Sequence, residues 1–150
     1  MSEPALQQAE ALSIDELLDN FELLGDWDSK YAYLVELGDA LPVFPDDWRQ
    51  EVNQVQGCMS QVWVRPVQQN ESDKKLFYSG DSDTPVIKGV LAVLIGLFSG
   101  NTAQQVQQID VETLFEQLGL KENLSPNRHV GVYAMVKLMQ EQANEFGVDN

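Results

Sequence analysis

Apolar residues recur at helical spacing near the start of the chain. The first predicted helix begins with a capping box at Ser13 and Glu16 and ends at Gly25. Its apolar face consists of Ile14, Leu17, Leu18, Phe21 and Leu24. A second amphipathic helix is predicted from about Asp28, with Gly38 near its end.

The pattern changes to alternation from Glu51 onward. The segments "EVNQV", "SQVWVRPV" and "KKLFYSG" are predicted strands, and the polar stretch "QQNESDK" predicts a hairpin between the last two. Pro66 has no N–H to donate to a neighbouring strand, so we expect it at a strand end or at an outward-facing edge position.

Helical spacing returns after the predicted hairpin. Thr84 is a predicted N-cap, with Pro85 at the first helical position. The helix to Phe98 is apolar on most of its surface, which predicts a central place in the core, and Gly100 ends it.

Three further helices complete the predicted order. Thr102 and Asp110 are predicted N-caps of two short helices, the second ending at Gly119, and the last helix opens at Ser125 and Pro126. The inner face of that last helix consists of Val132, Met135, Val136, Met139 and Ala143. We therefore expect an α+β fold, in which a small antiparallel three-stranded sheet packs with N- and C-terminal helices. Residues 1–150 form one predicted domain, with residues 1–12 disordered.

Composition and charge narrow the possible partners. The chain has 150 residues, 43% hydrophobic and 22% charged, which suits one core. A formal net charge of −15 disfavours nucleic acids and anionic membranes as partners. This charge serves either solubility or attraction toward a basic patch on a protein. The N-terminus lacks the features of a secretion signal, and the longest apolar run is too short to span a bilayer, so we expect a cytoplasmic protein.

Cys58 is the single cysteine, which indicates a reducing compartment. Lone cysteines are commonly small buried hydrophobic residues. Cys58, however, follows Gly57 in a turn-like stretch and has the polar neighbours Gln56, Ser60 and Gln61. A thiolate at such a tip is a candidate nucleophile, because reactivity follows exposure and pKa. Spacing alone leaves both interpretations open.

The sequence gives weaker indications for metal binding and for catalytic roles of other residues. One cysteine and His129 cannot supply the four ligands of a zinc or iron–sulfur site, so no metal or other cofactor is predicted. His129 is either a base for Cys58 or an exposed residue in the first turn of the last helix. Arg128 opposes the dipole of that helix, so it is either solvated or held by a carboxylate or a partner. Asp81 and Asp83 suit turn and helix-start positions.

Four segments form a pattern when taken in order: "KYAYLVELGDALP", "NQVQGCMSQVWV", "SGDSDTPVIKGVLAVLIGLFSG" and "LSPNRHVGVYAMV". Together they resemble the SufE family of sulfur-acceptor proteins in iron–sulfur cluster assembly, and the resemblance runs from about Ile14 to Ala143. The family pattern is kept at Cys58, at Gly57 and at Arg128.

The resemblance implies a fold shared with the scaffold protein IscU, without that scaffold's set of cysteines. It implies that Cys58 takes persulfide sulfur from a pyridoxal-phosphate cysteine desulfurase of the SufS or CsdA kind and passes it toward a downstream cluster scaffold. The protein would then be a carrier and activator with no turnover of its own. Gln56, Gly57, Asp81, Asp83 and Arg128 are the expected partner-binding residues.

Two other interpretations stay open. In the first, the protein is a thiol enzyme, such as a single-cysteine peroxidase or a hydrolase, in which His129 or Arg128 supports Cys58. In the second, it is a partner-binding module whose cysteine is inert. Lone-cysteine chemistry with no convincing base favours the carrier.

Overall fold

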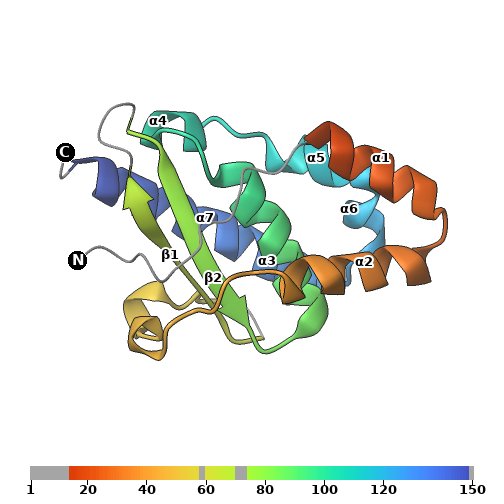
Figure 1. The fold of residues 1–150 in the computed structure, drawn as a ribbon, viewed down its shortest axis with the longest axis horizontal. Helices are drawn as coiled ribbons and strands as arrows, with labels where there is room; N and C mark the ends of the chain where they lie inside the picture. The colour runs from red at the N-terminus through yellow and green to blue at the C-terminus, as the bar shows by residue number, and fades with distance from the viewer. Residues whose placement is uncertain (1–13, 58–59, 70–73, 149–150) are drawn as a thin grey trace.

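The computed structural model describes residues 14–57, 60–69 and 74–148. The chain forms a two-stranded hairpin surrounded by helices, with α3 beside the hairpin and α7 crossing behind both (Figure 1). The order is α1 (Ile14–Leu24), α2 (Trp27–Asp39), the 3-10 turns η1 (Asp46–Trp48) and η2 (Glu51–Asn53), β1 (Val62–Gln69), β2 (Leu76–Ser82), α3 (Pro85–Phe98), α4 (Ala103–Val106), α5 (Val111–Leu118), α6 (Leu120–Asn123) and α7 (Pro126–Val148). The predicted α+β class is confirmed.

The predicted third strand is wrong. The segment "EVNQV" contains η2, and only Gln54 forms a bridge, with Trp63 of β1. The described residues therefore hold a sheet of two strands, antiparallel, in which Val62 faces Ser82 and Gln69 faces Leu76. The two valines that suggested a strand lie in different surroundings: Val52 is exposed on the surface, and Val55 is buried in the core.

The outer edge of β2 is covered by the segment that follows α3. The N–H of Leu76 donates to the Asn101 carbonyl, and the N–H of Gly100 donates to the Leu76 carbonyl, each at 2.7 Å. The Tyr78 N–H donates to the Ser99 hydroxyl at 3.2 Å. These bonds satisfy backbone groups that a third strand would otherwise satisfy.

The outer edge of β1 is covered by two different elements. The Val55 N–H donates to the Val62 carbonyl at 2.8 Å, and Nε2 of Gln142 on α7 donates to the Val64 carbonyl at 2.7 Å. The backbone N–H and C=O groups of successive residues point to alternate sides of a strand. The nitrogen of Pro66, which has no hydrogen to donate, therefore points to the same outer edge as the Val62 and Val64 carbonyls. The predicted edge position of Pro66 is therefore confirmed, and the strand register shifts just after it.

Helix α3 is the centre of the core, as predicted from its apolar sequence. Most of its residues are buried, and it packs against α2, β2 and α7. Gly38 and Gly89 allow the closest approach: a Cβ built on Gly89 would lie 2.1 Å from the Leu34 carbonyl oxygen. The backbones of α2 and α3 touch there, which only a residue without a side chain permits.

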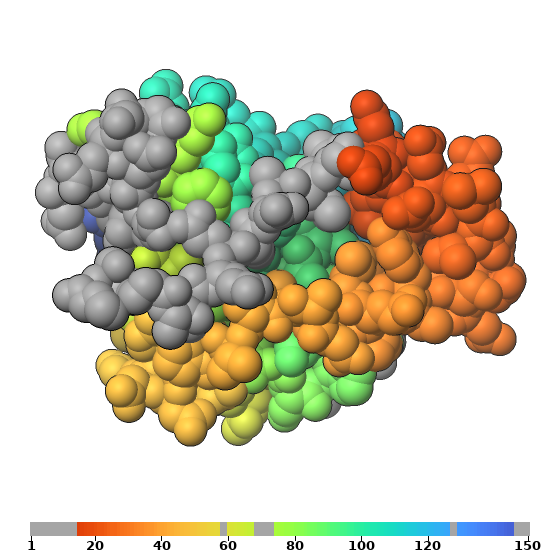
Figure 2. Space-filling view, in the orientation of Figure 1, coloured from red at the N-terminus to blue at the C-terminus, as the bar shows by residue number. Residues whose placement is uncertain are grey.

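The N-terminal helices differ from the prediction only at their ends. Gly25 has a φ of 79° and follows the end of α1, as predicted. Helix α2 starts earlier than predicted, because the Asp26 carboxylate accepts from the Ser29 N–H and caps it. In the space-filling view, α1 and α2 form one end of the molecule (Figure 2). The predicted capping residue Ser13 and the predicted disordered residues 1–12 lie outside the described residues.

The C-terminal helices were predicted more closely. Thr102 and Asp110 cap α4 and α5, and Gly119 ends α5 with a φ of 76°. The four-residue helix α6 was missed, because it follows Gly119 directly and is too short to show a period. On α7 the predicted inner face is buried at Val132, Met135, Met139 and Ala143, while Val136 is half-buried.

Candidate functional site: the flanks of Cys58

Cys58 and Met59 lie outside the described residues, so the site is built from the segments on either side of them. On the N-terminal side, Val55 is anchored in the core and bonded to Val62 of β1. Gln56 and Gly57 are exposed. The chain thus leaves the core at Val55 and reaches the surface within two residues.

Gly57 has a φ of 88°, a left-handed conformation that other residues adopt only with strain. Among the described residues, a Cβ at this position would meet nothing closer than the Ala134 side chain, at 4.0 Å. Gly57 therefore lies over the N-terminal half of α7, and the requirement for glycine comes from the backbone and not from crowding.

On the C-terminal side, the chain is fastened to the start of α3. The Gln61 N–H donates to Oδ1 of Asp83 at 3.1 Å, and the Asp83 N–H donates to the Gln61 carbonyl at 3.2 Å. The hydroxyls of Ser60 and Thr84 share a hydrogen bond of 2.7 Å. Two hydrogen bonds that involve side chains and one between backbone groups thus hold the residues that follow Cys58.

The predicted N-cap residue of α3 is confirmed as Thr84, but its side chain has another role. It occupies the N-cap position, but its hydroxyl makes no capping hydrogen bond. The hydroxyl is bonded to Ser60 and donates to Oδ1 of Asp83 at 3.1 Å. Contact with a distant segment has therefore replaced the local cap.

Asp81 lies at the centre of a group of charges under this site. Its carboxylate accepts from Arg49 at 2.6 Å and pairs with Lys88 at 3.1 Å. Burial raises the pKa of Asp81, but the hydrogen bonds from Arg49, Lys88 and the Ser82 N–H outweigh it, so the pKa lies below its usual value. This carboxylate stays ionised and joins the segment after α2 to β2 and α3.

Arg49 extends the same group. Its guanidinium lies over the rings of Trp63, 4.9 Å from the centroid, and of Phe44, 5.4 Å away. It also bonds the exposed carboxylate of Asp46 at 3.2 Å. The hydrogen bond to Asp81 raises the pKa of Arg49, so the cation is permanent.

Arg128 and His129 lie in the first turn of α7. The Arg128 side chain is outside the described part of the structure. His129 is half-buried in a small pocket with Phe115 of α5, Leu124 and Tyr133. At about 100° per residue, His129 and Ala134 are about 140° apart around the helix. The structure therefore turns His129 away from the face of α7 that Gly57 covers.

Among the described residues, no group of three or more His, Asp or Glu side chains could hold a metal ion. Within the same ranges, every helix is too short or too polar to cross a bilayer.

The sequence did not reveal three residues that position the site, which are Arg49, Lys88 and Ser60. Each of them contacts a residue at least 7 positions away in the chain, so no local pattern indicates its role.

Comparison with known proteins identifies the family. The SufE family, described as an Fe-S metabolism associated domain, matches residues 15–143. The chain belongs to the SufE family. An uncharacterized SufE-like protein of Rhizobium etli is 36% identical over 132 residues, which cover 87% of this chain and 89% of the relative. An uncharacterized SufE-like protein of Rhizobium meliloti is also 36% identical, over 87% of this chain and 94% of the relative.

The SufE assignment confirms the resemblance drawn from the four sequence segments. It places the chain in iron–sulfur metabolism, in a family of sulfur acceptors. The matched range contains Cys58, Asp81, Asp83 and Arg128, together with the hairpin, α3 and most of α7.

Proposed function

We propose that this SufE protein accepts sulfur on Cys58 from the persulfide of a cysteine desulfurase, activates that enzyme and relays the sulfur to a cluster scaffold. The thiolate of Cys58 attacks the terminal sulfur of the desulfurase persulfide. A bond forms between the two sulfurs, the desulfurase sulfur–sulfur bond breaks, and the desulfurase cysteine leaves as a thiolate. Cys58 then carries the persulfide, and the transfer needs no oxidant and no metal.

One observation carries the proposal: the family-matched range contains a single cysteine, Cys58, on a segment anchored at both ends. Val55 fixes the entrance in the core, and Gln61 is bonded to Asp83 at the exit. Between these two anchors lies Gly57, whose backbone is less restricted by steric contacts than that of any other residue type. A thiol on such a segment can enter another protein's active site while the fold behind it stays unchanged.

The single thiol also suits a persulfide carrier. A second thiol nearby would attack the persulfide, release sulfide and leave a disulfide. A chain with one cysteine retains its sulfur until an acceptor from another protein reaches it. We expect this exchange in the cytoplasm, where desulfurase and scaffold would both be reduced.

The partner-binding residues follow from the same arrangement. Gln56, Gly57 and Asp83 are exposed around Cys58, and we propose them as contacts of the desulfurase. Asp81 belongs to the same proposed surface, although its carboxylate is already paired with Arg49 and Lys88. Its part in docking is then to hold the shape of the surface, with Asp83 making the exposed contact.

The deciding experiment measures sulfur on the protein. The SufE protein is incubated with a cysteine desulfurase from the same organism, pyridoxal phosphate and L-cysteine, and the intact protein is weighed without reductant. We expect a mass gain of one sulfur in the wild type and none in Cys58→Ser, which removes the only nucleophilic thiol. Unchanged circular dichroism of the variant is the control. Equal activation of the desulfurase by Cys58→Ser, with no reductant present, would contradict covalent transfer.

Arg128 is proposed as a docking residue of the same partner. Its position in the first turn of α7 opposes the helix dipole, which favours a role outside the helix. Arg128→Ala should raise the concentration of SufE protein that half-activates the desulfurase by about tenfold, about 1.4 kcal/mol of binding. The thermal midpoint should stay within 2 °C or so of the wild type. A large loss of stability with unchanged activation would assign Arg128 to the fold instead.

A further inference from the structure

A groove runs along the outer edge of β1, between η2 and the C-terminal half of α7. Val52, Pro66 and Leu138 give it apolar walls, and Glu141 and Glu145 line it from α7. Both glutamates are exposed, and neither forms an ion pair with a described residue. The groove thus combines apolar surface with two uncompensated carboxylates.

Gln142 lines this groove and carries a buried hydrogen-bond acceptor that is not used. The residue is only 7% exposed, and its Nε2 donates to the Val64 carbonyl at 2.7 Å, which fixes the orientation of the amide. Its Oε1 is buried and finds no donor among the described residues. A buried acceptor without a donor costs about 1–3 kcal/mol, so the folded protein gains when a donor reaches it.

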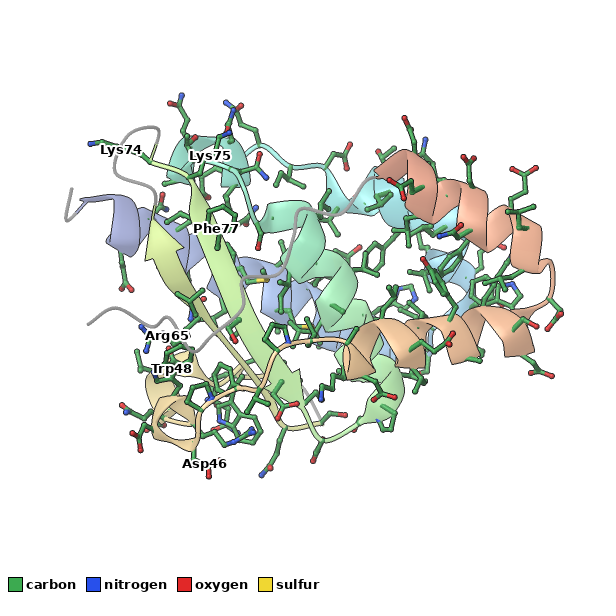
Figure 3. All side chains as sticks on the ribbon, in the orientation of Figure 1. Asp46, Trp48, Arg65, Lys74, Lys75 and Phe77 are labelled. Carbon is green, nitrogen blue, oxygen red and sulfur yellow. The ribbon has the colours of Figure 1, made fainter. Side chains whose placement is uncertain are left out.

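Arg65 lines the same groove but does not meet this need. Its guanidinium lies over the Trp48 ring, 4.1 Å from the centroid, and its Nε donates to the Pro66 carbonyl at 3.1 Å (Figure 3). Two glutamates against one arginine leave the groove with a net negative charge. An incoming cation is therefore favoured, provided that it also carries N–H donors.

The groove is continuous with the proposed sulfur-transfer site. Leu138 lies one helical turn beyond Ala134, the residue under Gly57, at an axial distance of about 6 Å. Val52 and Asn53, on the opposite side, precede Gly57 by only a few residues. A protein that docks over Gly57 therefore lies about one helical turn of α7 from the start of the groove.

We propose that this groove receives an arginine or lysine side chain of the cysteine desulfurase during sulfur transfer. The aliphatic part of that side chain packs on Leu138 and Pro66, and its charged end pairs with Glu141 and Glu145. One of its N–H groups donates to Oε1 of Gln142 after a small adjustment of the groove. This inference rests on the proposed function, to which it adds a second contact next to the proposed sulfur-transfer site.

Charge reversal with a matched control tests the groove. Glu141→Lys with Glu145→Lys reverses two exposed groove charges. Asp19→Lys with Glu22→Lys reverses two exposed charges on α1, at the other end of the molecule from the end of α7 (Figure 1). At physiological salt, which screens distant charges, we expect the groove variant to raise the half-activating concentration at least about tenfold. Activation at saturation should be unchanged, and the α1 variant should match the wild type.

Cross-linking identifies the occupant. Val52 is 69% exposed beside the groove and Leu23 is 83% exposed on α1, so each can carry p-benzoylphenylalanine with little strain. The residue at position 52 should cross-link the desulfurase within a few residues of an arginine or lysine, and the residue at position 23 should not. Cross-linking to a segment without a basic residue would overturn the proposal.

The two proposals fail in different ways. If the groove variant and the α1 variant activate the desulfurase at the same concentration, the groove is not a docking site, although sulfur still reaches Cys58 in the wild type. If the wild type takes up no sulfur from the desulfurase, the proposed function is overturned, and the assignment of the groove to that enzyme is overturned with it.

Discussion

Glycine is required at positions 89 and 57 for different physical reasons. Position 89 belongs to the packed scaffold, and position 57 belongs to the candidate site. At Gly89 the backbones of α2 and α3 touch, so any side chain would enter the Leu34 carbonyl. At Gly57 the nearest described atom would lie 4.0 Å from such a Cβ, and it is the φ of 88° that calls for glycine. The α2–α3 crossing is closed by packing at Gly38 and Gly89. Ser60 and Gln61, which follow Cys58, are instead held by hydrogen bonds to Thr84 and Asp83.

The largest effect is expected from adding one methyl group at the crossing. Gly89→Ala places a carbon 2.1 Å from the Leu34 oxygen, so the helices must separate, and we expect a loss of more than about 3 kcal/mol of unfolding free energy. Gly57→Ala meets no described atom closer than 4.0 Å and should cost about 1–2 kcal/mol through backbone strain. Urea denaturation of both variants measures the difference. Equal losses would remove the distinction between the two regions.

The next effect concerns the charges under the site. Asp81→Asn keeps the shape but loses the charge that Arg49 and Lys88 contact, and should cost about 1–3 kcal/mol at neutral pH. The folded pKa of Asp81 lies below the ordinary value of 3.8, so its contribution is complete above that pH and is lost as the pH falls through the lower folded value. Denaturation curves from pH 7 to 2 should show wild type and variant converging below about pH 4.

Asp46→Asn is the control for this pair. Asp46 bonds the same Arg49, but its side chain is 96% exposed, so its removal should barely change stability at any pH. A loss equal to that of Asp81→Asn would mean that the exposed and the partly buried contacts of Arg49 are equivalent.

The smallest effect is expected at the end of the Cys58 segment. Asp83→Ala removes the acceptor of the Gln61 N–H and should change global stability by less than about 1 kcal/mol. The amide of Gln61 should nevertheless exchange with solvent about fivefold faster, as measured by hydrogen exchange and NMR. The amide of Val55, bonded to Val62 in the core, is the internal reference. If both amides accelerated together, the segment and the core would open as one unit.

The sequence was sufficient where structure is local. Apolar periodicity predicted α1, α3 and α7, and Thr102, Asp110 and Gly119 were identified as helix ends from residue type alone. The hairpin was predicted because alternation and a polar turn are both contained in the segment from β1 to β2. Each of these features depends on residues within a few positions of one another.

The sequence failed where a distant segment decides. Nothing near Thr84 shows that its hydroxyl bonds Ser60, 24 positions away, in place of capping α3. Asp81 was identified, but its ion pair with Arg49, 32 positions earlier, requires the fold. Gln142 carried no sequence signal at all, because an amide in a helix gives no indication that it will cover a strand 78 positions away.

The coverage of the hairpin has a consequence for association between copies of the protein. An isolated pair of strands has two free edges, and each can template the addition of a strand from another chain. Here the segment after α3 occupies one edge, while Val55, Gln142 and the donor-free Pro66 close the other. Unwinding of the last turns of α7 would release Gln142 and uncover the Val64 carbonyl. The C-terminal half of α7 therefore covers a backbone acceptor of β1 that a strand of another chain would otherwise meet.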